Sequence, residues 1–292
     1  AKAVELSETV IPALNHKNAY IRNASEPNGT KPGYTGDRYC PDCDTVLEKG
    51  YTYWVEDNLT WKLYEDGTLN ISGTGTMKDY DYNNNPSPAS QKKDSVKKVV
   101  IEDGVTSIGD WAFYHCNSLT NITIPGSVTN IGHSTFFGCK NLTSITILDG
   151  VTSIGMSVFS SCESLTDIII PNSVTSIEED AFSNCKSLTS ITIPNSVTSI
   201  ENFVFLGCSS LTDVTIPDSV TSIGESAFSN CSSLQTISLS CKSTLKRSDF
   251  GDQADLVSYT SHTLKKTEAK AATYAENGNK AYWTCEHCGK YF

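Results

Sequence analysis

The sequence predicts a repeat solenoid, a β-rich stack of similar turns that is capped at both ends. Between residues 101 and 239, one pattern recurs six times at intervals of 23 residues. A strict period of this length is typical of repeat proteins, because stacked turns bury together the apolar face that no single turn can bury alone. Three residue types keep the period in all copies: Phe113, Phe136, Phe159, Phe182, Phe205 and Phe228; Cys116, Cys139, Cys162, Cys185, Cys208 and Cys231; Leu119, Leu142, Leu165, Leu188, Leu211 and Leu234.

Within one unit, the apolar spacing fits neither a helix nor a simple strand, so the chain is expected to turn inward repeatedly. The segment Leu188-x-x-Ile191-x-Ile193 alternates at its end, as a short parallel strand does. Pro194 follows directly and ends the strand, because proline has no N–H to donate to the ladder. On the opposite side, the stretch Glu178 to Cys185 predicts a short helical turn.

These motifs carry a resemblance. The segment from Leu188 to Ile193 resembles the strand of leucine-rich repeats, and the unit with Ala-Phe, Cys and Ser-Leu-Thr resembles the bacterial BspA-type surface repeats over residues 101–239. The resemblance implies a right-handed leucine-rich-repeat stack with short parallel strands and short helical turns. It also implies an extracellular or cell-surface protein that adheres to a host matrix protein or glycan. The family's usual asparagine after the strand is not constant here, so the turn is expected to be held partly in another way: Gly126, Asp149, Asn172, Asn195, Asp218.

Residues 51–100 predict the N-terminal cap, which a repeat stack needs to cover its apolar end and its open strand edge. Trp61–Leu63 and Leu69–Ile71 alternate and are joined through Asp66-Gly67, a strong hairpin signal. The polar tract 79–93 contains two prolines and predicts a loop. Residues 240–260 lose the period and are expected to form a C-terminal cap or linker.

The two ends of the chain, residues 1–50 and 261–292, are interpreted as diverged copies of one small Cys-pair module. Each copy combines a histidine with a C-x-x-C pair. The second copy resembles short Cys-pair modules of Gram-positive surface proteins, and we expect it to continue past residue 292. The histidine and cysteines of the first copy are His16, Cys40 and Cys43. Those of the second copy are His262, Cys285 and Cys288.

The chemistry of these pairs is left open between disulfides, zinc sites and reduced thiols. In a secreted protein, Cys40 with Cys43 and Cys285 with Cys288 are disulfide candidates. With His16 or His262 added, each module offers three metal ligands, one fewer than a closed tetrahedral zinc site requires. The six repeat cysteines are instead expected to be buried thiols, since side chains on adjacent rungs run parallel and do not face each other.

Composition and motifs exclude several classes of function. The net charge of −11 disfavours nucleic acid and anionic membranes as partners. No apolar run approaches the roughly 20 residues of a membrane span. No common catalytic motif occurs, and His115 and His133 occupy positions that vary between copies, so both are interpreted as solvated surface residues. The sequence therefore predicts a non-enzymatic, monomeric protein without a cofactor.

The candidate binding surface is the outward side of the strands. One column of side chains varies between repeats and the next is nearly uniform threonine, while a third column, beginning at Thr106 and Thr129, is also threonine. Threonine ladders also stabilise sheets, so a rigid spacer that displays another domain is the alternative function. The proposed binding residues, for a protein or glycan, are Asn121, Ser144, Asp149, Asp167, Ser190, Thr192, Asp213 and Thr215.

Overall fold

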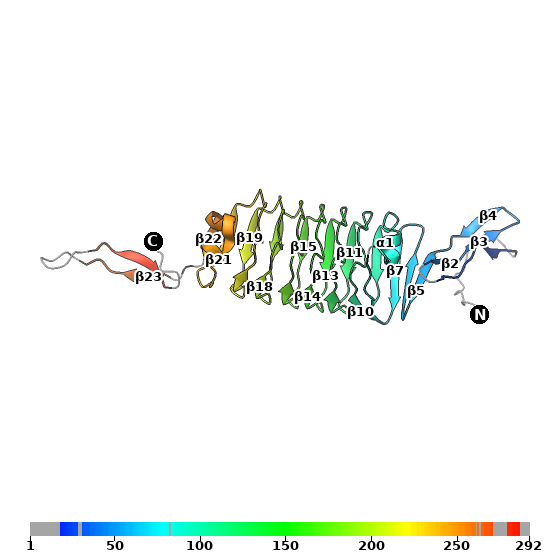
Figure 1. Ribbon diagram of the computed structural model, residues 1–292, viewed down its shortest axis with the longest axis horizontal. Coiled ribbons are helices and arrows are strands. Elements are labelled where there is room, and N and C mark those ends of the chain that lie inside the picture. The colour runs from blue at the N-terminus through cyan, green and yellow to red at the C-terminus, as the bar shows by residue number, and fades with distance from the viewer. Residues whose placement is uncertain are drawn as a thin grey trace.

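The computed structural model describes residues 18–28, 31–81, 83–260, 262, 264–270 and 279–286. Its centre is an elongated stack of parallel strands, with a small sheet at the N-terminal end and a two-stranded hairpin at the C-terminal end (Figure 1). The predicted β-rich repeat solenoid is confirmed.

One side of the solenoid is a 12-stranded sheet in which each turn adds a strand. Neighbouring strands pair in parallel one repeat apart, as Ile122 does with Ile145 and Val214 with Ile237. Apolar side chains point inward at alternate positions, which fixes the register. The parallel strands are β7 (Thr68–Gly73), β9 (Lys98–Ile101), β11 (Asn121–Ile124), β13 (Ser144–Ile147), β15 (Asp167–Ile169), β17 (Ser190–Thr192), β19 (Asp213–Ile216), β21 (Thr236–Ser240) and β22 (Val257–Thr260).

A second side carries shorter strands, joined to the first by a tight turn. The turn is closed by backbone: Val128 N–H donates to the Pro125 carbonyl and Val197 N–H to the Pro194 carbonyl, both at 3.1 Å. This bond closes turns both without and with the asparagine, since Gly126 lies in the first of these turns and Asn195 in the second. The strands form a five-stranded and a two-stranded sheet: β8 (Gly75–Thr76), β10 (Val105–Ile108), β12 (Asn130–Ile131), β14 (Ser153–Ile154) and β16 (Ser176–Ile177), then β18 (Ser199–Ile200) and β20 (Ser222–Ile223).

The third side differs from the expected helical turn at Glu178–Cys185. Asp180 and Asn184 adopt positive φ angles of 58° and 59°, so successive N–H groups do not point along one axis. Phe182 N–H instead donates across to the Val204 carbonyl of the next turn, at 2.9 Å. A helix would use these N–H groups within the segment. Alternate N–H groups bond locally, as Ser183 does to the Asp180 carbonyl at 3.0 Å, so both local turns and contacts between neighbouring repeats hold this side.

The interior is built from columns of identical side chains. Successive phenylalanine rings are nearly parallel, with centroids 5.2–5.7 Å apart. Beside them, Cys185 Sγ lies 3.1 Å from the Phe159 carbonyl and donates to it, and the same contact recurs along the ladder. Burial raises the pKa of the Cys185 thiol to about 12. The six repeat cysteines are buried thiols, as predicted.

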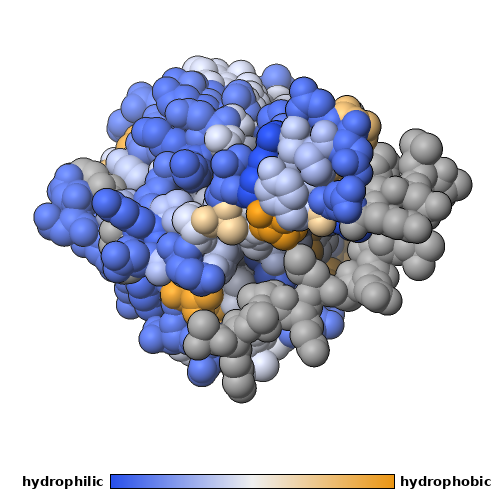
Figure 2. Space-filling model, turned by 90° about the vertical axis from the view of Figure 1, so that its right-hand side faces the viewer, coloured by the Kyte–Doolittle hydropathy of each residue, from blue (hydrophilic) through white to orange (hydrophobic). Residues whose placement is uncertain are grey.

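Each end of the stack is closed by an aromatic ring. At the N-terminal end, Trp61 packs on Phe113 with centroids 6.0 Å apart. It lies on the hairpin of β6 (Leu59–Leu63) and β7, in which Leu63 pairs with Leu69, as the sequence predicted. At the other end, Phe250 packs on Phe228 at 6.3 Å. Seen from the N-terminal end, the surface is mostly hydrophilic with scattered apolar groups (Figure 2).

Two short helices lie in segments without the repeat pattern. The tract expected as a loop contains α1 (Pro88–Gln91), because Ser87 caps Ser90 N–H at 2.9 Å and Pro88 suits the first helical position. The C-terminal cap contains the 3₁₀ segment η1 (Arg247–Leu256), which carries Phe250 onto the core.

The remaining strands flank the solenoid. At the N-terminal end, β1 (Tyr20–Arg22), β3 (Asp37–Cys40) and β4 (Thr45–Glu48) form an antiparallel sheet. There, β2 (Gly33–Tyr34) and β5 (Thr52–Glu56) pair with each other and continue the 12-stranded sheet through β6. At the C-terminal end, β23 (Leu264–Thr267) and β24 (Tyr282–Cys285) pair only with one another among the described strands.

Candidate binding face

The outward side chains of the 12-stranded sheet form two straight columns, here called the outer columns. In β11, β13 and β19, exposed and buried residues alternate, and strand pairing sets equivalent residues side by side about 4.8 Å apart. Of the predicted binding residues, Asp149 alone lies elsewhere, in the turn after β13. The outer columns are Asn121, Ser144, Asp167, Ser190, Asp213 and Thr236, and Thr123, Thr146, Ile169, Thr192, Thr215 and Ser238.

A third column of threonines has a different role. Thr152 donates from Oγ1 to the Thr129 carbonyl at 3.2 Å, and Thr175 donates likewise to Thr152. Thr129 and Thr221 repeat the contact with the turn before each of them. These hydroxyls are used to join successive turns, so the stabilising interpretation is correct for this column.

The hydroxyls of the second outer column are available to a ligand. Thr123, Thr146, Thr192 and Thr215 are exposed, and within the described chain their side chains form no hydrogen bond. The stack does not need these groups for its own hydrogen bonding, so a ligand can bind them without breaking an internal contact.

One residue interrupts the polar surface. Ile169 lies in β15 between Thr146 and Thr192, and its side chain is 75% exposed. Every other copy has threonine or serine at this position. Leu148, which is 46% exposed, is similarly unusual, because the equivalent residues are prolines in four copies and Ser240 in the last. An isolated exposed apolar residue is common on proteins. Ile169 lies between the polar residues Thr146 and Thr192, and the next apolar residue of the column is the half-buried Val100 beyond Thr123.

Charge changes along the first outer column. Lys98 of β9 pairs with Asn121 and is exposed at the N-terminal end of the column, whereas Asp213 is exposed toward the C-terminal end. Asp167 occupies its expected backbone position in β15, but its side chain lies outside what the structure describes. Among the described side chains, the column presents a cation at Lys98, the amide of Asn121 and the hydroxyls of Ser144 and Ser190, and an anion at Asp213.

The interpretation of His115 as a simple solvated residue is wrong. The backbone at this position adopts a positive φ angle, and this conformation limits which residue types can occupy it. His115 has φ of 54°, and the equivalent residues also lie in the left-handed region: Gly138 at 70°, Ser161 at 60° and Asn184 at 59°. Glycine and asparagine tolerate this conformation best. Their recurrence at this position was a signal in the sequence for positive φ.

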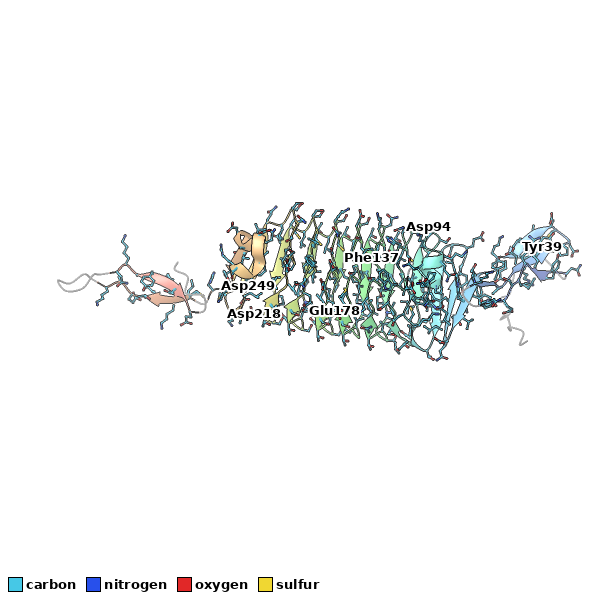
Figure 3. All side chains as sticks on the ribbon, viewed as in Figure 1. Tyr39, Asp94, Phe137, Glu178, Asp218 and Asp249 are labelled. Atoms are coloured by element: carbon cyan, nitrogen blue, oxygen red, sulfur yellow. The ribbon has the colours of Figure 1, made fainter. Side chains whose placement is uncertain are left out.

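His115 is also part of an aromatic cluster, defined by Trp111, Tyr114, His115 and Phe137, which are half-buried on the turn side of the first two repeats. Tyr114 is the centre, with ring centroids 4.9 Å from Trp111 and 5.6 Å from Phe137. Burial, with a smaller contribution from Lys93, lowers the pKa of His115. Phe137 is marked on the solenoid in Figure 3.

His133 lies in a column of side chains that accept hydrogen bonds from the next turn. Asp110 Oδ1 accepts from His133 N–H at 2.6 Å, and His133 Nδ1 accepts from Met156 N–H at 3.1 Å. Asn202 Oδ1 accepts from Glu225 N–H at 2.8 Å. Although the residue type at this position varies, Asp110, His133 and Asn202 share one structural role, because each accepts a backbone N–H bond from the next turn. The position is exposed, as expected, but solvation is not its only role.

The Cys-pair modules are only partly within the described residues, since His16 and Cys288 lie outside them. In the first module, the Cys43 sulfur lies 2.8 Å from the Thr45 hydroxyl. Hydrogen bonds from Thr45 and Cys40 lower the pKa of the Cys43 thiol. The disulfides of both pairs stay predictions. Cys285 is buried, and the structure places it near His262 and near Cys241, a cysteine that the repeat pattern left unexplained.

Comparison with known proteins identifies the repeats. The family described as "BspA type Leucine rich repeat region (6 copies)" matches residues 87–186 and 152–275. The chain belongs to this BspA-type leucine-rich repeat family. No curated protein matches the chain. The match includes α1 and the C-terminal cap as well as the central repeats, so BspA-type features extend past the strict 23-residue period.

Solved leucine-rich repeat proteins are similar to this chain. One is a leucine rich cell surface protein from Faecalibacterium prausnitzii, with 32% identity over 64% of this chain and 54% of that chain, and a TM-score of 0.39. A leucine-rich repeat protein from T. pallidum has 26% identity, coverage of 62% and 90%, and a TM-score of 0.47. One from Eubacterium ventriosum has 25% identity, coverage of 66% and 74%, and a TM-score of 0.36.

Two further observations bear on the BspA-type chain. Among the helices of the described residues, none combines the length and the apolar character that a membrane crossing requires.

Exposed charges on the turn side pair with one another: the Glu163 carboxylate oxygens lie 3.4 Å from Lys140 Nζ and 3.1 Å from Lys186 Nζ. These lysines lower the pKa of the Glu163 carboxyl, with the Lys186 hydrogen bond contributing most.

Proposed function

We propose that the chain is a non-enzymatic recognition protein of the cell surface or extracellular space, which binds a host matrix protein or glycan through the outer columns. Membership of a leucine-rich repeat family supports a role in protein interactions. Repeat solenoids bind through extended surfaces, since stacking produces a long regular face. The proposed contact residues are those predicted from the sequence, with Asp149 at the margin of the face.

The observation that carries the proposal is the contrast between Ile169 and its column. The copies on both sides have threonine at this position, and the stack does not use the threonine hydroxyls for its own hydrogen bonds. An isoleucine that is 75% exposed contributes little to the core, so stability of the stack does not explain it. A buried apolar contact surrounded by polar groups is the usual centre of a protein-binding surface. This favours a protein ligand over a glycan.

The test is a binding screen with the full chain and two substitutions. Immobilised matrix proteins, mucin and plant glycans are titrated with wild type, Ile169→Thr and Asp213→Lys. Ile169→Thr restores the residue of neighbouring repeats and should leave folding unchanged. We expect at least a tenfold loss of affinity for Ile169→Thr, the size of a central contact.

The matched control is Glu201→Lys, which makes the same charge change as Asp213→Lys but beside β18 on the other strand side. It should bind like wild type. Saturable binding that both face variants retain would move recognition to another surface. A folded protein that binds no ligand on the panel would favour the rigid spacer instead. Binding to glycans alone would replace the protein ligand with a carbohydrate one.

A further inference from the structure

Three metal-ligating side chains meet where the solenoid joins the C-terminal hairpin. Cys241, His262 and Cys285 each offer one ligand atom, and these sulfur and imidazole nitrogen atoms all lie within 4.8 Å of one another. It is the one such group of three or more within the described part of the chain. The three residues are far apart in the sequence, and Cys241 belongs to neither Cys-pair motif.

The fold explains how they meet. The adjacent parallel strands β21 and β22 end together, with Ser240 opposite Thr260. Cys241 follows the first strand directly, and its N–H donates to the Thr260 carbonyl at 2.9 Å. His262 follows the second strand, just before β23. Cys285 is the last residue of β24 and pairs with Leu264, so the hairpin returns it to the same edge.

We propose that Cys241, His262 and Cys285 bind a zinc ion that fixes the C-terminal hairpin to the last turn of the solenoid. Two thiolates and an imidazole are a ligand set that zinc prefers. Zinc bonds of about 2.0–2.3 Å place tetrahedral ligand atoms roughly 3.3–3.8 Å apart, which small side-chain shifts reach from the present arrangement. The fourth position is left for water or a further donor.

Burial supports a built site. Cys241 is 4% exposed and Cys285 is 1% exposed, whereas His262 is half-buried. Two sulfur ligands inside the junction, with the imidazole toward solvent, leave an approach for the ion. Thiols lose their protons when they bind zinc, so binding should release protons and weaken as the pH falls.

The bound zinc ion would attach the hairpin to the solenoid, which main-chain hydrogen bonds among the described residues do not do. Within the described strands, β23 and β24 form a separate sheet and make no ladder with β22. In Figure 1 the hairpin lies beyond the end of the solenoid. A metal bound by residues from both parts would order the junction, because the free energy of binding is then also free energy of docking.

The experiment measures zinc in the full-length chain purified under reducing conditions. We expect one equivalent of zinc at the junction, lost in both Cys241→Ser and His262→Gln. Replacement by cobalt should give the visible bands of a tetrahedral site with thiolate ligands, and these bands should vanish in the same variants. Cys43→Ser, a cysteine of the N-terminal pair, is the control that should keep the junction spectrum.

Because Cys241→Ser also changes a buried residue, folding is checked separately. His262→Gln alters a half-buried side chain and should retain the unfolding midpoint of the metal-free protein. Zinc should slow amide exchange in β23 and β24 in wild type and not in His262→Gln. Wild type without junction zinc, variants that keep it, or a native disulfide joining Cys241 to Cys285 in the intact-mass map would each overturn the proposal.

Discussion

Each end of the solenoid adjoins a segment with a C-x-x-C pair, interpreted from the sequence as a copy of one module, and the two segments are attached in different ways. At the N-terminal end the large sheet continues into the module, with Gly33 paired to Tyr53 and the Tyr53 hydroxyl donating to Glu26 at 2.8 Å. At the C-terminal end the hairpin has its own sheet, and the side chains of Cys241, His262 and Cys285 meet at the junction.

The difference shows that a solenoid can end its sheet in two ways. Antiparallel strands prolong the N-terminal edge as far as β2, so main-chain hydrogen bonds attach the module at Gly33 and Tyr34, while β1, β3 and β4 form a sheet of their own. At the other end β22 is the last strand, and specific side chains must position the hairpin of β23 and β24. Attachment at the N-terminal end should therefore be insensitive to any one side chain, whereas attachment at the C-terminal end should depend on three.

The closure of the core should give the largest effect. Trp61→Ala removes a fully buried ring that covers Phe113, and we expect a loss of about 3–5 kcal/mol in the free energy of unfolding. Phe250→Ala at the other end should cost less, about 3 kcal/mol, because the ring is 6% exposed and lies on a short 3₁₀ segment that can relax. Urea denaturation measures both.

A larger loss for Phe250→Ala than for Trp61→Ala would reverse the comparison of the two ends. It would mean that the C-terminal cap, and not the hairpin of β6 and β7, is the more tightly packed closure.

Between the two closures, the buried thiols predict a loss of stability at alkaline pH. Burial raises the pKa of Cys185 from 9.0 to about 12, so the folded state disfavours the thiolate. The contribution is complete below pH 9 and is lost as the pH rises from 9 toward 12. At pH 10 the loss should be about 1.4 kcal/mol for such a residue.

The measurement is urea denaturation at pH 7 and pH 10 with a reductant present. Cys185→Ala should be less stable than wild type at pH 7 but should lose less on going to pH 10. An unchanged difference between the two pH values would show that the thiol is not protected from ionisation as its burial predicts.

The threonine columns allow a matched pair with a smaller effect. Thr152→Val removes the Oγ1 donor to the Thr129 carbonyl and should cost about 0.5–1 kcal/mol, since that carbonyl keeps its bond from the Thr152 N–H. Thr192→Val makes the same chemical change in the second outer column and should change stability by less than about 0.3 kcal/mol. Equal costs in thermal unfolding would contradict the assignment of different roles to the two columns.

The smallest effect should come from the N-terminal attachment. Tyr53→Phe removes the hydrogen bond to Glu26 but leaves the strand pairing of β2 and β5, so the loss should be below about 1 kcal/mol. Amide exchange at Gly33 and Tyr34 should stay slow. Release of the module in this variant would show that one side chain, and not the ladder, holds it.

The sequence was sufficient for features that repeat or are local. The period placed Phe159 and Cys185 in the interior, and Asp66-Gly67 located the hairpin of β6 and β7. Residues 79–93 illustrate a local miss, because Ser87 followed by Pro88 was a helix start that composition concealed. The turn side was predicted as a helical turn, but its N–H groups alternate between partners: Ser183 donates locally to the Asp180 carbonyl, whereas Phe182 donates to the neighbouring turn.

The candidate site was predicted as columns, and the structure assigned their roles. Thr152 and Thr192 look alike in the sequence, but only the position of the preceding carbonyl decides that one is bonded and the other is available. Likewise, the exposure of Ile169 could be expected from its place in the pattern, whereas the absence of a competing internal role required coordinates.

The stacked architecture, the composition of its interior and the need for caps can be derived from the amino-acid sequence, because they follow from periodic burial and from chemistry along the chain. How each end is joined, and which distant groups meet, depends on the folding of the chain in three dimensions. Cys241 ends one strand, His262 follows the next, and Cys285 returns on a hairpin. Their proximity depends on strand ends that align in space, which no spacing in the sequence expresses.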